Sequence, residues 1–158
     1  MDVPIFNQLD TVPRNNSNNL CWATSTAMWA AFLLEGDIDG TLEIAQHVMG
    51  SEVVSEYNCP FSWASTNHAG LDIAERQVQS YGNLTMQEIK DTIGDGSHFG
   101  VFYRNETSGH WILGIGYVYV PGQGYRVVSI DPWGGVQSSR TYDDFQTLPD
   151  GRVWAWTV

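Results

Sequence analysis

The sequence predicts an α+β protein in which helices come first and an antiparallel sheet follows. Up to about residue 95, apolar side chains recur at helical spacing and the segments stop at Gly. After residue 98, segments rich in Val, Ile, Tyr and Trp alternate with turns. A length of 158 residues suits one domain with its own hydrophobic core. We therefore expect a single domain over residues 1–158, with a helical lobe over about 1–95 and a β lobe over about 96–158.

Four helices are expected in the first lobe. The first runs from Cys21 to about Leu34 and is apolar nearly all round, so it should be the buried central helix. A short helix over Thr41–Met49 and an amphipathic helix over Leu71–Tyr81 follow. The last begins at a capping box, Thr85–Glu88, and runs to about Ile93.

The second lobe is predicted to contain four strands. Their residue types are β-branched and aromatic, which favours a pleated and partly buried surface. A hairpin loop, Pro121–Gly124, joins the middle two. The expected strands are Phe99–Tyr103, Trp111–Val120, Tyr125–Ile130 and Val153–Val158.

The chain is acidic, with 18 Asp and Glu against 7 Lys and Arg and a net charge of −11. No basic patch is visible, so neither a nucleic-acid partner nor an anionic membrane surface is expected. No apolar run is long enough to span a membrane. The start, Met1–Phe6, lacks a basic region and a long apolar core, so we expect no signal peptide in this sequence.

Cys21 is the most informative residue because it lies where an Asn-rich loop gives way to the first helix. The first turn of a helix favours a thiolate, since it carries partial positive charge and unsatisfied N–H groups. A thiolate there is a candidate nucleophile. Two alternatives stay open, namely a disulfide with Cys59 and an inert core thiol.

Two residues downstream complete the pattern of a thiol-dependent triad. His110 lies in Gly109–Leu113 and Asp131 in Ser129–Gly135, each at the edge of a strand-like segment. The order Cys, His, Asp matches a nucleophile, a general base and a carboxylate that orients the base. The alternatives are an ordinary hydrogen-bonded strand histidine and a turn aspartate before Pro132.

Four motifs together resemble a papain-like cysteine peptidase, and more narrowly the small bacterial double-glycine-type peptidases and avirulence-effector proteases. They cover most of the chain and occur in family order. The resemblance implies a two-lobed papain-like fold whose nucleophile helix packs on the antiparallel sheet. The motifs are Val3–Gln8, Cys21–Met28, Gly109–Tyr117 and Asp131–Gly135.

The resemblance also implies a role for Gln8, and two tryptophans are candidates for the substrate cleft. Gln8 would donate to the oxyanion, although it lies 13 positions before Cys21 (21 − 8), farther than in papain. Trp22 and Trp133 would wall the substrate cleft, and core packing remains the alternative for both. The side-chain amides that could replace Gln8 belong to Asn15, Asn16, Asn18 and Asn19.

The predicted function is that of a thiol-dependent peptidase that hydrolyses peptide bonds through Cys21, His110 and Asp131 and an acyl-enzyme. We expect a peptide or protein substrate, a monomer, and no cofactor or metal, and the resemblance favours a secreted or delivered bacterial protein. Two alternatives remain: an acyltransferase or glutamine deamidase with the same triad, and a non-catalytic module that binds peptides or glycans. The other histidines lack metal-ligand spacing and are expected on the surface or in loops: His47, His68 and His98.

Overall fold

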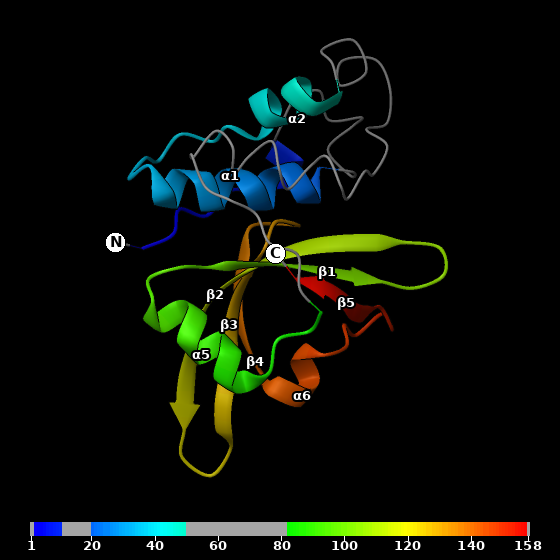
Figure 1. Cartoon of the computed structure of the whole chain (residues 1–158). Helices are drawn as coiled ribbons and strands as arrows, with labels where there is room; N and C mark the ends of the chain where they lie inside the picture. The colour runs from blue at the N-terminus through cyan, green and yellow to red at the C-terminus, as the bar shows by residue number, and fades with distance from the viewer. Residues whose placement is uncertain (1, 11–19, 50–81, 158) are drawn as a thin grey trace.

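A computed structural model describes residues 2–10, 20–49 and 82–157, and within them it confirms the α+β class (Figure 1). Helices α1 and α2 come first, and the sheet with two further helices follows. The helical elements are η1 (Gln8–Asp10), α1 (Cys21–Leu33), α2 (Thr41–Met49), α5 (Met86–Gly94) and α6 (Tyr142–Phe145). The strands are β1 (Phe99–Arg104), β2 (Gly109–Val120), β3 (Gly124–Asp131), β4 (Val136–Thr141) and β5 (Val153–Thr157).

Helix α1 is the buried central helix that its composition predicts. It begins at Cys21, and most of its side chains are buried on every side. It ends where the Gly36 amide donates to the Ala31 carbonyl at 2.8 Å and Glu35 adopts a φ of 55°. This reversal satisfies a terminal carbonyl and stops the helix.

The sheet has the strand order β4-β3-β2-β1-β5, and all of its neighbouring strands are antiparallel. The four predicted strands are confirmed, with ends that differ by a few residues. Strand β4 was not predicted, because its sequence Val-Gln-Ser-Ser-Arg-Thr is polar and half-exposed. It forms at the edge of the sheet, where pairing with β3 supplies its backbone hydrogen bonds.

Helices cover both faces of the sheet, so its two apolar faces form separate cores (Figure 1). Helix α1 packs on one face, where Trp22 and Met28 meet Trp111 and Leu113 of β2. Helix α5 packs on the other through Ile89, although it precedes residue 96 in the chain. Within the described residues α5 therefore packs with the strands rather than with α1.

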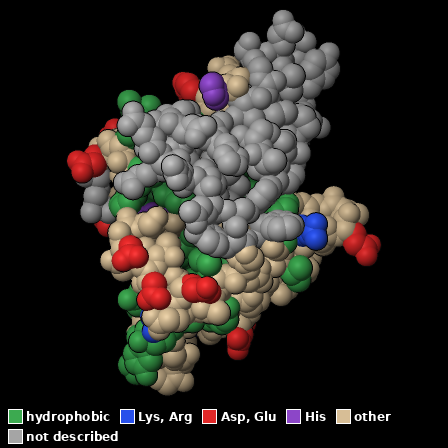
Figure 2. All heavy atoms as spheres, in the orientation of Figure 1, with side chains coloured by type: hydrophobic (Ala, Val, Ile, Leu, Met, Phe, Trp, Pro, Cys, Tyr) green, Lys and Arg blue, Asp and Glu red, His purple; other side chains and the backbone are tan. Residues whose placement is uncertain are grey.

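Several predictions fall outside the described residues. They concern the helix Leu71–Tyr81, Cys59, His68 and the asparagines between residues 11 and 19. None of the helices that the structure describes is long and apolar enough to cross a membrane. On the face seen in Figure 2, Asp and Glu side chains outnumber Lys and Arg, as the composition requires.

Candidate active site

Cys21 is the first residue of α1 and carries a free thiol. A disulfide with Cys59 is therefore excluded in this structure. The side chain is 6% exposed and lies close enough to His110 to raise the pKa of that imidazole. Its place at the head of the helix puts it beside N–H groups that have no partner within the helix.

His110 and Asp131 are joined by a short hydrogen bond across the sheet. Nε2 of His110 lies 2.7 Å from Oδ1 of Asp131. His110 is buried at the start of β2, and Asp131 is partly exposed at the end of β3. The same Oδ1 accepts the Trp133 N–H at 2.8 Å, which holds the carboxylate in the turn after β3. With Nε2 engaged, Nδ1 is the ring nitrogen left for the thiol.

The surroundings of His110 favour its charged form. Burial lowers the pKa of His110, but hydrogen bonds to Asp131 and Cys21 and the charges of both groups outweigh it and raise the pKa to about 9. The ring is therefore an imidazolium at neutral pH. Because Cys21 and Asp131 both act on the imidazole, the three side chains form one electrostatic unit.

Gly109, directly before His110, allows a close approach of β1. A Cβ at this position would lie 2.5 Å from ring atoms of Phe102, which is buried in the core. Any larger residue would push the two strands apart or displace Phe102. The glycine thus sets the position of the strand start that carries His110.

A charged pair that the sequence analysis missed borders His110. The Nε atom of Arg152 donates to Asp150 at 2.9 Å, and its Nη1 donates to the Gly109 carbonyl at 3.4 Å. The hydrogen bond from Arg152 lowers the pKa of Asp150, and the charge of His110 contributes in the same direction. Sequence alone offers no signal that this pair lies beside His110, because Arg152 and Gly109 lie in separate segments.

Gln8 lies next to the turn that follows Asp131. Its side chain is fully buried, and its N–H donates to the Pro132 carbonyl at 2.9 Å. The N-terminal segment and the Asp131 turn therefore meet, although Gln8 is far from both Cys21 and Asp131 in the sequence. This contact brings the predicted oxyanion donor to the same region as the predicted acid.

The two tryptophans have different environments. Trp22 is 1% exposed and belongs to the core between α1 and the sheet, as the core-packing alternative expects, so a cleft-wall role for it has no support here. Trp133 is 48% exposed and directly follows the Asp131–Pro132 turn. It presents an aromatic surface near Asp131, and its role as a cleft wall stays a prediction.

The structure describes two of the other histidines, His47 and His98. His47 is exposed on α2, as expected. His98 precedes β1 in a loop, but it is buried and stacks on Phe32 with ring centroids 4.1 Å apart. Tertiary packing against α1, which a single loop position does not reveal, covers it. Among the described residues, no group of three or more His, Cys, Asp or Glu could hold a metal ion.

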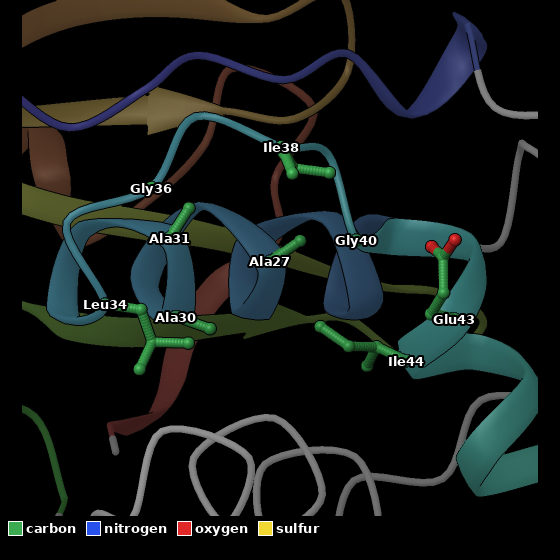
Figure 3. A pocket seen from close by; sticks show the side chains of 9 residues that line it. All are labelled: Ala27, Ala30, Ala31, Leu34, Gly36, Ile38, Gly40, Glu43 and Ile44. Carbon is green, nitrogen blue, oxygen red and sulfur yellow. The ribbon is translucent and has the colours of Figure 1, made fainter.

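An apolar hollow of about 270 Å³ lies away from these residues (Figure 3). Ala27, Ala30 and Ala31 of α1 line it, with Ile38 and Ile44 from the following loop and α2. None of Cys21, His110, Asp131 or Gln8 lines it. It is therefore separate from the candidate active site.

The head of α1 carries the free thiol of Cys21, and the imidazole of His110 bonds to the carboxylate of Asp131. A comparison with protein families matches residues 1–157 to the Peptidase_C39 like family, and the chain belongs to that family. Family membership indicates a papain-like cysteine peptidase. A search of curated proteins finds no match.

Proposed function

We propose that this protein is a thiol-dependent peptidase that cleaves peptide bonds through a Cys21–His110–Asp131 triad. The observation that carries the proposal is the imidazole of His110, which bonds to Asp131 at 2.7 Å and interacts with the Cys21 sulfur. Cys21 is the nucleophile and His110 the proton carrier. Asp131 holds the imidazole in one orientation and stabilises its positive charge.

The reaction has two stages, formation of the acyl-enzyme and its hydrolysis, and the same side chains act in both. The Cys21 thiolate attacks the carbonyl carbon and forms the C–S bond, and the carbonyl electron pair moves to the oxygen. The Gln8 side-chain amide and the Cys21 backbone N–H donate to this oxyanion. The C–N bond then breaks as His110 gives its proton to the leaving amine. Water attacks the acyl-enzyme while His110 takes its proton, and the released thiolate restores the starting state.

The resemblance to papain-like peptidases supports the remaining parts of the proposal, which concern the fold, the partner and the setting. A two-lobed papain-like arrangement with Trp133 beside the substrate fits the resemblance of the four motifs. The partner is a peptide or protein substrate, and the protein acts as a monomer. The bacterial, secreted or delivered setting follows from the resemblance alone.

Substitution of Cys21 tests the proposal directly. Cys21→Ala should abolish peptide cleavage while the circular dichroism spectrum and unfolding midpoint stay close to those of the wild type. Cys59→Ala is the matched control and should retain activity. Iodoacetamide at mildly acidic pH should label Cys21 in preference to Cys59. Full activity in Cys21→Ala would refute the peptidase assignment and favour a non-catalytic peptide- or glycan-binding module.

The same assay separates hydrolysis from acyl transfer. An acyl-enzyme can pass its acyl group to an amine as well as to water, and the triad could also deamidate a glutamine side chain. Addition of a primary amine should leave the acid as the main product. A dominant amide product, or ammonia release from glutamine without chain cleavage, would replace hydrolysis with those activities.

A further inference from the structure

We propose that Asn7 is a positioning residue that holds Gln8 in register with the Asp131–His110 pair. The inference rests on the proposed function, because it concerns the oxyanion donor of the same site. It starts from a hydrogen bond between residues 127 positions apart, in which the Gly134 N–H donates to Oδ1 of Asn7 at 3.0 Å.

Two hydrogen bonds of opposite direction join the N-terminal segment to the turn after Asp131. The Gln8 N–H donates to the Pro132 carbonyl at 2.9 Å, and the Gly134 N–H donates to Asn7 Oδ1. The Asn7 side chain therefore takes the place that a backbone carbonyl has in an antiparallel pair of strands. Two such bonds fix both the distance and the rotation of one segment relative to the other.

Local bonds hold the Asn7 side chain in place. Its Oδ1 also accepts the Leu9 N–H at 3.1 Å, and its Nδ2 donates to Oδ2 of Asp10 at 3.1 Å. This is a side-chain turn that presets the orientation of the amide before it meets Gly134. An alanine at position 7 would lose all three bonds.

The turn on the other side accepts this contact because of Gly135. Its φ is +62°, and a Cβ there would lie 3.2 Å from Cγ2 of Ile5 and 3.4 Å from Cβ of Asn7. The backbones thus approach more closely than most residues would allow. Asp131 opens the same turn and accepts the Trp133 N–H within it. The two bonds that Gln8 and Asn7 make to Pro132 and Gly134, which we call the clamp, therefore hold the turn that begins at Asp131.

The clamp contains no group that reacts. It connects the segment that carries Gln8 to the turn that carries Asp131, and it sets where the Gln8 amide lies relative to the carbonyl that Cys21 attacks. Oxyanion donors act only when they lie within hydrogen-bond distance of the developing charge. Loss of the clamp should therefore slow acylation more than it changes the reactivity of the thiol.

Kinetics of Asn7→Ala test this, with a fluorogenic peptide chosen by library profiling and with iodoacetamide as probes. Alkylation needs the Cys21 thiolate but forms no oxyanion. We expect kcat to fall about tenfold, KM to stay about the same, and the alkylation rate to remain near that of the wild type. Asn83→Ala is the matched control: it removes another long-range asparagine bond, to Gln146 at 3.2 Å, and should leave kcat unchanged.

Two further variants sharpen the test. Asn7→Asp combined with Asp10→Asn keeps the net charge of the two residues and keeps an acceptor oxygen at residue 7. The bond between residues 7 and 10 forms again with the donor at residue 10, so kcat should be close to that of the wild type. In a Gln8→Ala background, Asn7→Ala should cost nothing further, because both act on the same donor.

The inference would be overturned if Asn7→Ala lowered kcat by the same factor in the wild type and in Gln8→Ala. It would also be overturned if Asn7→Ala lowered the alkylation rate as much as kcat. An unchanged kcat in Gln8→Ala would also overturn it. That result would not affect the proposed peptidase function, which Cys21→Ala tests independently through the nucleophile.

Discussion

His110 and Asp131 meet across two neighbouring strands, with Nε2 of the imidazole 2.7 Å from Oδ1 of the carboxylate. Antiparallel pairing of β2 with β3, in which Leu113 lies opposite Ile130, brings the start of one strand beside the end of the other. Cys21 joins this pair from α1, which packs against β2. The triad that we propose is thus assembled where one helix begins, one strand begins and one strand ends.

The pKa of His110 predicts the alkaline limit of activity. The imidazolium is the acid that protonates the leaving amine, and its pKa is raised to about 9. We therefore expect kcat/KM to fall as the pH rises through about 9. In Asp131→Asn this limb should move down by about one to two pH units, since a charge-assisted hydrogen bond contributes about 1.5–3 kcal/mol.

Asp143→Asn is the control for that pH profile, because Asp143 is exposed on α6. Its alkaline limb should match that of the wild type. An Asp131→Asn limb that stays at the wild-type pH would contradict the coupling of Asp131 to His110.

Loss of the Gln8 amide should reduce kcat by about 10²–10³, the usual cost of one oxyanion donor. Gln8→Ala and Gln8→Glu both remove that donor, and Gln8→Glu keeps most of the side-chain volume. Steady-state kinetics of both variants, with thermal unfolding as a control for folding, measure the effect. If Gln8→Glu keeps wild-type kcat, the oxyanion role belongs to another group.

Gly114 should tolerate no side chain. A Cβ there would lie 2.3 Å from the ring of Phe99, which is 1% exposed. We expect Gly114→Ala to destabilise the protein by about 1–3 kcal/mol through overpacking. Gly116→Ala, on the same strand, is the matched control: its Cβ would lie 3.8 Å from Cβ of Val128, an ordinary contact. Urea unfolding compares them, and equal stabilities would contradict the packing argument.

His98 should make the fold sensitive to mild acid. Burial lowers the pKa of His98 below its usual value near 6.5. The unfolded chain therefore binds the proton more readily, so this contribution to stability is full above about pH 6.5 and declines as the pH falls below it. His98→Phe keeps an aromatic ring against Phe32 and should lessen that decline.

His47→Phe supplies the comparison, because His47 is exposed on α2. Urea unfolding at pH 7 and pH 5 should show the same decline in His47→Phe as in the wild type. If the free energy of unfolding of His98→Phe falls between pH 7 and pH 5 as much as that of the wild type and of His47→Phe, then His98 is not the group responsible.

Local patterns were sufficient for much of the fold. The apolar run that begins at Cys21, the capping box at Thr85 and the hairpin glycines each act within a few residues, so the sequence predicts them well. Strand β4 escaped prediction, because a polar segment such as Val136–Thr141 becomes a strand only when a neighbour supplies hydrogen bonds. The burial of His98 escaped it for the same reason, since Phe32 of α1 covers the ring.

The sequence by itself determined the kinds of side chain available for chemistry and their order along the chain: an amide, a thiol, an imidazole and a carboxylate. Only the tertiary structure decided that His110 and Asp131 lie within hydrogen-bond distance, that Trp22 is core while Trp133 is exposed, and that Asn7 bonds to Gly134. The physical reason is range. Helix capping and hydrophobic periodicity act between near neighbours, whereas these contacts join distant segments and exist only once the sheet and α1 have packed together.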